Sequence, residues 1–314
     1  MGETDSLQKV AAAQVRYIKL GPGGAWFRRC MKDGTVEFGH SSIPHELARS
    51  LDRSAIEARL LANGRSAAKA KDFSREICDF YGLGSDCLWS TIGEGRLWWA
   101  FAEPEVTLIP PAPGRGARQR SVIGRWCDHD LLGRPLTLEG LSTRLTKVAA
   151  YRQTLCRVEA EAYLLRRING VEEPVVVEAK AARAQLIKCA RSLIQQLDWR
   201  DFELLVDLIF SDGGWRRASA VGGSDQADTD LILEHPTTGE TAFVQVKSRA
   251  APAMLADYIE RFRASGFDRM FFVCHSPVGA LACDAPDVHL WLGERLAEQT
   301  VRAGLFDWLV EKAR

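Results

Sequence analysis

The sequence predicts an α/β protein, α+β overall, in two domains. A small β-rich domain with a few helices is expected over residues 1–174, and a mixed sheet flanked by helices over residues 175–314. In the first half, short apolar and aromatic runs alternate with glycines and prolines, which is typical of many short strands joined by turns. In the second half, helical periodicity alternates with β-type runs, which indicates a sheet covered by helices. Gly170 and Pro174 interrupt the periodicity at the boundary, and a length of 314 residues agrees with two domains.

The first half contains five expected strands and one expected helix. The strands are predicted at residues 14–21, 34–40, 87–92, 96–102 and 105–109, and the helix at residues 70–82. In the strand "RLWWAFA", side-chain alternation directs Trp98 and Trp99 to opposite faces. Such a strand needs apolar cover on both of its faces.

The second half alternates helices and strands and includes one hairpin. Helices are predicted at residues 178–198, 199–210, 252–266 and 294–313, and strands at 216–221, 230–235, 241–249, 269–276 and 288–293. The turn "PTTGE" joins the strand at 230–235 to the strand at 241–249. These two strands are therefore expected to be antiparallel neighbours.

Composition favours a cytoplasmic protein without a membrane partner. No apolar run approaches the roughly 20 residues of a membrane span, and the first residues, "MGETDSLQKV", lack the apolar core of a signal peptide. Eight scattered cysteines without paired spacing favour free thiols. The net charge is zero, but residues 1–174 hold 25 basic against 21 acidic side chains. This modest excess fits a DNA-reading first half.

Four polar residues of the second half are expected to converge. Asp230 begins one strand of the predicted hairpin, and Gln245 and Lys247 point to one face of the other. Glu203 lies on the helix "DFELLVDLIF", on the flank opposite its apolar stripe. A helix packed on the sheet can aim Glu203 at the same point.

Phosphodiester hydrolysis requires a set of this kind. Asp and Glu oxygens hold Mg²⁺, and the backbone carbonyl of Val246, between Gln245 and Lys247, is a natural further ligand. A bound Mg²⁺ lowers the pKa of its water and polarises the phosphoryl oxygen. A lysine beside it can stabilise the charge of the transition state or assist deprotonation. Taken singly, each residue is more often a solvated side chain or a cap, so the joint order and spacing carry the prediction.

The stretches "WRDFELLVDLIFSDGGWRR", "VGGSDQADTDLIL" and "FVQVKSRA" resemble the PD-(D/E)xK nuclease superfamily, and more closely the Mrr-type restriction endonucleases, over about residues 185–314. In that family glutamine replaces the usual acid before x-Lys. The resemblance implies a restriction-endonuclease-like fold, with Asp230 as the metal ligand, Gln245 at the variant acid position, Lys247 as the catalytic lysine and Glu203 as an auxiliary ligand. Asp228 stands where that family often has glycine, and it is the alternative metal ligand.

Aromatic residues concentrate in the first half, where five of the nine tryptophans precede residue 130. Most are expected in the core. A tryptophan among Trp98, Trp99 and Trp126 that faces a pocket would instead stack on an extruded base, with Asp128 as a hydrogen-bond acceptor. The layout of short strands is similar to the PUA-like group, which includes EVE and SRA domains; this is a likeness of fold alone.

The stretch "PPAPGRGARQR" predicts a basic, flexible loop that carries three arginines, Arg115, Arg118 and Arg120. Its composition supports two interpretations equally. The loop is either solvated or in contact with DNA phosphates.

Together these patterns predict a modification-dependent DNA endonuclease of restriction or phage-defence type. It would act on double-stranded DNA with Mg²⁺, for which Mn²⁺ can substitute. Cutting both strands normally needs two sites, so a homodimer is expected. The alternatives are a repair or structure-specific nuclease, and a non-catalytic DNA-binding sensor.

Overall fold

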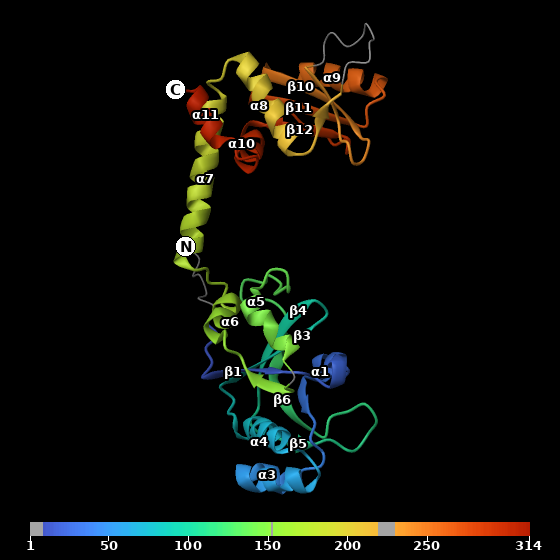
Figure 1. Cartoon of the computed structure of the whole chain (residues 1–314), viewed down its shortest axis with the longest axis vertical. Helices are drawn as coiled ribbons and strands as arrows, with labels where there is room; N and C mark the ends of the chain where they lie inside the picture. The colour runs from blue at the N-terminus through green and yellow to red at the C-terminus, as the bar shows by residue number, and fades with distance from the viewer. Residues whose placement is uncertain (1–8, 152, 219–229) are drawn as a thin grey trace, which may run out of the picture. The chain divides into compact units, whose positions relative to one another are not determined.

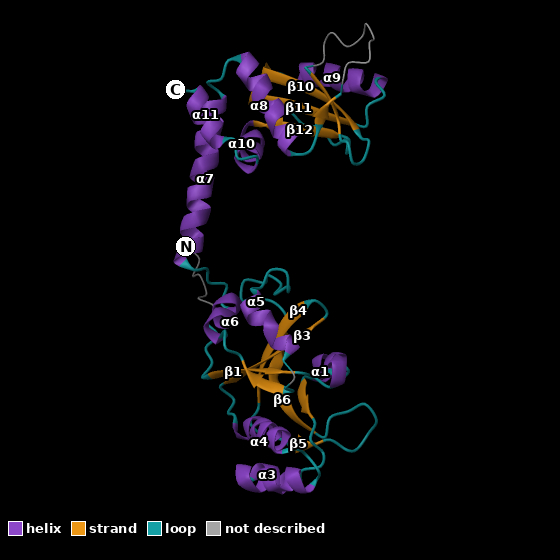
Figure 2. Ribbon diagram, viewed as in Figure 1, coloured by secondary structure: helices purple, strands orange, loops and turns teal. Residues whose placement is uncertain are grey.

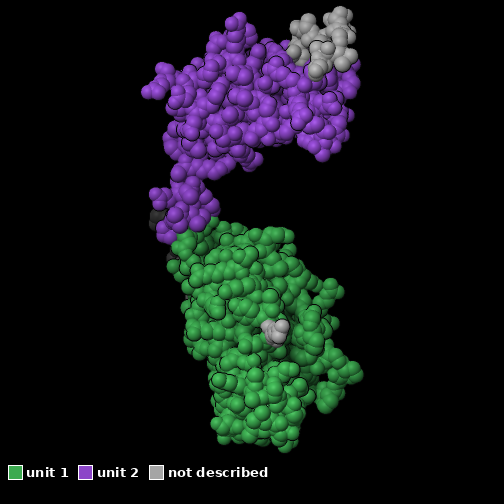
Figure 3. Space-filling view, in the orientation of Figure 1, with its two compact units in different colours: residues 1–173 green, residues 174–314 purple. Residues whose placement is uncertain are grey.

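The computed structural model describes residues 9–151, 153–218 and 230–314. The chain forms two compact units, Met1–Glu173 and Pro174–Arg314 (Figure 3). The division lies one residue before the expected boundary. The protein is α/β with one mixed sheet in each unit, as predicted.

Unit 1 is built on a seven-stranded sheet (Figure 1). Its strands are β1 (Gln14–Ile18), β2 (Thr35–Phe38), β3 (Cys87–Gly93), β4 (Arg96–Ala102), β5 (Thr107–Leu108), β6 (Arg118–Cys127) and β7 (Leu155–Arg157). The order is β2-β6-β4-β3-β1-β7, and β5 pairs with β6. β1 and β3 are parallel, whereas the other pairs are antiparallel. The five expected strands are confirmed, because each coincides with one of β1 to β5.

Two apolar clusters cover the two faces of this sheet. Trp98 packs against one cluster and Trp99 belongs to the other, which confirms that the two tryptophans point to opposite faces. The α-helices of unit 1 are α1 (Phe27–Asp33), α2 (His45–Arg49), α3 (Arg53–Ala62), α4 (Ala67–Gly82), α5 (Thr143–Thr146) and α6 (Glu161–Ile168). Among them the sequence located α4, since the others have too few turns for a clear periodic signal.

Unit 2 alternates helices with the strands of a five-stranded sheet (Figure 2). It contains α7 (Pro174–Ile194), α8 (Trp199–Asp212), β8 (Arg216–Arg217), β9 (Leu231–Glu234), β10 (Thr241–Ala250), α9 (Pro252–Ala264), β11 (Arg269–Pro277), β12 (Val288–Leu292), α10 (Gly293–Arg302) and α11 (Phe306–Lys312). The order is β12-β11-β10-β9-β8. β9 and β10 form the expected antiparallel hairpin, and β11 runs parallel to β10 and β12.

Alternating side chains of β10 enter two different cores. Val244 and Val246 pack with α7, α8 and α10, whereas Phe243 packs with α9. Gln245 and Lys247 therefore lie on the α9 face of the strand. Polar side chains in a strand covered on both faces need polar partners, because burial without them costs free energy.

The single helix expected at residues 294–313 is wrong, because α10 ends and α11 begins within that range. Gly304 has a φ of 71°, and its N–H donates to the Val301 carbonyl. Glycine adopts this left-handed conformation readily, and it is a common stop signal after a helix. β8 is also shorter than expected, although residues 219–221 of that predicted strand lie outside the described residues.

Within the described residues, no helix has the length and apolar character needed to cross a membrane. All eight cysteines lie in the described parts of the chain and are free thiols.

Candidate active site

Asp230 lies at the point where β9 stops pairing with β10. The last residue pair between β9 and β10 is Leu231 with Val244. The next β10 amide that faces the β9 side, that of Val246, therefore has no backbone partner in β9. The Oδ2 atom of Asp230 accepts this N–H at 2.7 Å. The same oxygen accepts from the Gln245 side-chain amide and from the Lys247 ammonium, the latter at 3.4 Å. The predicted convergence of these three side chains is present in the structure.

Gln245 is fully buried, with 0% of its surface exposed. Its amide nitrogen is used by Asp230, but its Oε1 atom has no hydrogen-bond partner among the described residues. A buried amide oxygen without a partner is rare because it loses its hydration without compensation. A cation bound at this end of the hairpin would supply the missing partner.

Lys247 is half-buried between the carboxylate and an aromatic ring. Its ammonium forms an ion pair with Asp230 and lies 5.6 Å from the centroid of the Tyr258 ring, on α9. The sequence analysis did not identify Tyr258, because only the docking of α9 on β10 brings it to the site. Both contacts hold the Lys247 side chain at a fixed position.

Glu203 projects from α8, whose neighbouring side chain Phe202 is buried in the core. The pKa of Glu203 is raised, first by partial burial and then by the negative charge of Asp230; the positive charge of Lys247 acts in the opposite direction. The convergence of Glu203 with these residues stays a prediction, with this electrostatic coupling in its favour. A raised carboxyl pKa beside a second carboxylate is typical of sites that bind a cation or move a proton.

The donors at this site suit a hard divalent cation. They are the Asp230 carboxylate, the unpartnered Gln245 oxygen, the Glu203 carboxylate and the carbonyl of Val246. In a strand, the N–H and C=O of one residue point to the same side, so the Val246 carbonyl faces the same edge as its N–H. Mg²⁺ prefers oxygen ligands of these kinds.

Side chains of His, Cys, Asp and Glu alone do not form a three-membered metal cluster in the described ranges. The predicted site does not require one, because two of its donors are an amide and a backbone oxygen. Asp228 lies outside the described residues, so the choice between Asp228 and Asp230 as the principal ligand stays a prediction.

The tryptophans predicted to read a base are engaged inside unit 1. Trp98, Trp99 and Trp126 each donate their indole N–H to a backbone carbonyl, those of Gly93, His129 and Thr35 respectively. Trp99 and Trp126 are buried. These contacts favour a core role for them.

The remaining expected nucleic-acid contacts are also paired within unit 1. Asp128 forms ion pairs with Arg96 and His129. Arg115 lies in the loop and forms an ion pair with the buried Glu37.

The prediction that Arg118 and Arg120 lie on a flexible loop is wrong. Arg118 and Arg120 belong to β6 and are buried, and their guanidinium groups donate mainly to backbone carbonyls. Alternation along a strand explains this, since residues two apart share the inward face. Neither side chain lies on an exposed, flexible loop.

A family model matches this chain, and the matched residues lie in unit 2. Residues 194–299 match the family model of the Mrr catalytic domain, described as a restriction endonuclease. This segment contains Glu203, Asp230, Gln245 and Lys247. No curated protein and no solved structure matches the chain significantly. The resemblance seen in the sequence is confirmed for residues 194–299, which match a restriction endonuclease catalytic domain of the Mrr type.

Proposed function

We propose that this chain is a metal-dependent DNA endonuclease that hydrolyses phosphodiester bonds at the Asp230 site. The observation that carries the proposal is the convergence of Gln245, Val246 and Lys247 on one Asp230 oxygen, inside the restriction endonuclease domain. The intact carboxylate and lysine favour catalysis over a role in binding alone.

The residues of the site have distinct tasks in this mechanism. Asp230, Gln245, Glu203 and the Val246 carbonyl would hold a divalent cation, which restriction endonuclease domains generally use. When bound, the cation would polarise the phosphoryl oxygen and lower the pKa of its water. Lys247, held by Asp230 and Tyr258, would stabilise negative charge that develops on the phosphate.

The finer parts of the proposal concern metal, partner and biological role. Mg²⁺ is the proposed cofactor, and Mn²⁺ is expected to replace it because both accept oxygen ligands. A homodimer would supply the second site needed to cut both DNA strands. Unit 1 would sense a modified base or another cue, which would make the enzyme modification-dependent and suited to defence against phage in the cytoplasm.

The first test is cleavage of plasmid DNA that is plain, methylated or hydroxymethylated, with Mg²⁺, with Mn²⁺ and with a chelator. We expect cleavage only with metal, and at least about tenfold faster cleavage of one modified substrate. Equal rates on all three substrates would reject modification dependence. Absence of cleavage under all conditions would reject the endonuclease.

Gln245→Glu should retain activity, because it places a second carboxylate oxygen where the unpartnered amide oxygen now lies. Without metal, the new carboxylate faces Asp230 and loses the amide donor, so we expect a loss of about 1–3 kcal/mol in unfolding free energy. Saturating Mn²⁺ should restore most of it. Melting curves with and without metal, beside a cleavage assay, measure both effects.

Ser211→Glu is the matched control, because it adds a carboxylate at an exposed position of α8. It should show no metal-dependent change in stability. A folded but inactive Gln245→Glu protein would argue against Gln245 as a metal ligand.

A further inference from the structure

Unit 1 contains a cavity of about 790 Å³ between two loops. One loop, residues 39–44, joins β2 to α2, and the other, residues 109–117, joins β5 to β6. Arg118 is paired with Phe38 of β2 and with Leu108 of β5, so it lies where both loops leave the sheet. It therefore forms the base of the cavity.

Arg118 is a buried cation without a carboxylate partner in the part of the chain that the structure describes. Only 1% of its surface is exposed. It donates to the Tyr81 hydroxyl at 3.0 Å and to the carbonyls of His40 and Ile43 at 2.9 Å, while its Nε has no partner. All three acceptors are neutral, and burial lowers the pKa of Arg118. Buried charges are normally paired, since an isolated one is costly.

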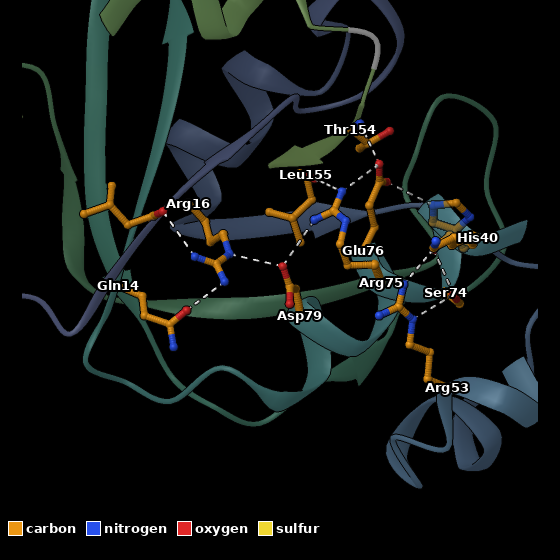
Figure 4. Close-up of polar contacts among 12 residues, drawn as sticks. Gln14, Arg16, His40, Arg53, Ser74, Arg75, Glu76, Asp79, Thr154 and Leu155 are labelled. Carbon is orange, nitrogen blue, oxygen red and sulfur yellow. Dashed lines mark hydrogen bonds and ion pairs between the residues drawn. The ribbon is translucent and has the colours of Figure 1, made fainter. Parts of the chain in front are cut away.

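Two other arginines of unit 1 have a carboxylate partner: Arg16 is ion-paired with Asp79, and Arg29 with the buried Glu37. Figure 4 shows the first of these pairs within a chain of contacts that ends at Glu76 and His40. Arg120 is buried and donates to backbone carbonyls as Arg118 does, but it does not line the cavity. The cavity at Arg118 has no Asp or Glu among its lining residues. An anion inside the cavity would supply the counter-charge that the chain does not.

Two histidines add nitrogen atoms to the cavity wall. His40 adopts a φ of 61°, which is strained for a residue with a side chain, and its Nε2 lies 3.6 Å from Glu76 Oε2 (Figure 4). Glu76 is fully buried, and this oxygen has no hydrogen-bond partner among the described residues. His40, a residue of the cavity wall, therefore lies beside a buried carboxylate oxygen.

His45 is oriented through Tyr81. The Tyr81 oxygen accepts from Arg118 and lies 2.9 Å from His45 Nδ1. The Tyr81 hydroxyl therefore links the Arg118 guanidinium to the His45 ring.

The rest of the cavity is apolar and includes flat surfaces. Trp26, Ile43, Leu108, Ile109, Pro110 and Pro111 contribute to it. A ligand that matches both parts has an anionic group and a planar ring with apolar faces. A nucleotide has a phosphate and a planar base, and the volume lies within the usual range for small-molecule sites.

We propose that this cavity binds a nucleotide, with its phosphate near Arg118 and its base against the wall that includes Trp26. The proposal deepens the sensing role given to unit 1 above and rests on it. It places the ligand site away from Trp98, Trp99 and Trp126. The nucleotide is either free in solution or extruded from DNA, and both sources offer the same chemistry.

The test uses the full chain without divalent metal. Its probes are the four deoxynucleoside 5′-monophosphates, the corresponding nucleosides, inorganic phosphate, and short duplexes with and without a mismatch, which eases base extrusion. We expect monophosphates or the mismatched duplex to bind at least about tenfold more tightly than nucleosides or phosphate. Competition between the duplex and the monophosphates identifies extruded DNA as a source; binding of monophosphates without competition identifies a free nucleotide.

Two variants decide whether the binding occurs in this cavity. Arg118→Gln removes the buried charge, and Ala112→Trp adds an indole at an exposed residue of the cavity wall. Each should weaken nucleotide binding at least about tenfold. Their matched controls are Arg28→Gln and Ala68→Trp, at exposed positions outside the cavity, which should bind as the unmodified chain does.

If Arg118→Gln does not fold, Ala112→Trp alone decides. The proposal is overturned if Ala112→Trp binds every probe like the unmodified chain, or if neither monophosphates nor the mismatched duplex bind at all. Plasmid cleavage tests the endonuclease separately. A chain that binds nucleotides but never cuts DNA would refute the proposed endonuclease activity and support the nucleotide site. A chain that cuts DNA but binds no nucleotide would support the endonuclease activity and refute the nucleotide site.

Discussion

Lys247→Ala is expected to lower the rate of DNA cleavage by about 10²–10³-fold or more, with DNA binding retained. The ammonium is the cation that the structure places beside Asp230, and its removal leaves the developing phosphate charge without that stabilisation. The half-buried ion pair contributes little to folding, so unfolding free energy should change by no more than about 1 kcal/mol. Single-turnover cleavage, a DNA-binding titration and a melting curve measure the three quantities.

Lys312→Ala is the matched control for this change. Lys312 lies on α11 and forms a surface ion pair with Asp201 of α8, so this change also removes one positive charge from unit 2. Its cleavage rate should equal that of the unmodified chain. If Lys247→Ala cuts as fast as its control, the assignment of the active site to β10 is incorrect.

Asp230→Asn should lose both metal binding and cleavage, with a fall in rate of about 10³-fold. Asparagine keeps an oxygen that can accept the Val246 N–H, so the end of the hairpin should remain folded. It lacks the negative charge that a hard cation requires. Calorimetric titration with Mn²⁺, beside the cleavage assay, separates loss of metal from loss of structure.

Asp207→Asn is the control, since Asp207 forms an ion pair with Arg217 in the same unit. We expect normal metal binding from it. Asp228→Asn should cost less than Asp230→Asn. A larger loss at Asp228 would transfer the role of principal ligand to that residue.

Local sequence patterns were sufficient to predict most of the strands and the candidate site of unit 2. The alternation of β10 placed Gln245 and Lys247 on one face before any partner strand was known, because the period of a strand is a property of its backbone. The turn before β10 likewise predicted the antiparallel pairing with β9, which carries Asp230 to the same edge. The candidate site was therefore predictable in its main residues.

Features that depend on contacts between distant segments were not predictable in this way. The sequence of "PPAPGRGARQR" is polar and rich in glycine and proline, yet its last residues begin a strand in which Arg118 and Arg120 are buried. Tyr258 became part of the Lys247 environment only when α9 packed on β10. Periodicity states which side chains share a face, whereas burial depends on what covers that face.

The sequence by itself determined the order and type of most helices and strands and the shared face of the β10 polar residues, because these follow from backbone geometry and side-chain spacing. The tertiary structure alone decided that Gln245 keeps an unpartnered oxygen beside Asp230, and that Arg118 lies beneath a cavity without a counter-charge. Each of these features depends on which residues, far apart in the chain, pack together and exclude water from the polar group. That is a property of the packed chain and of no single segment.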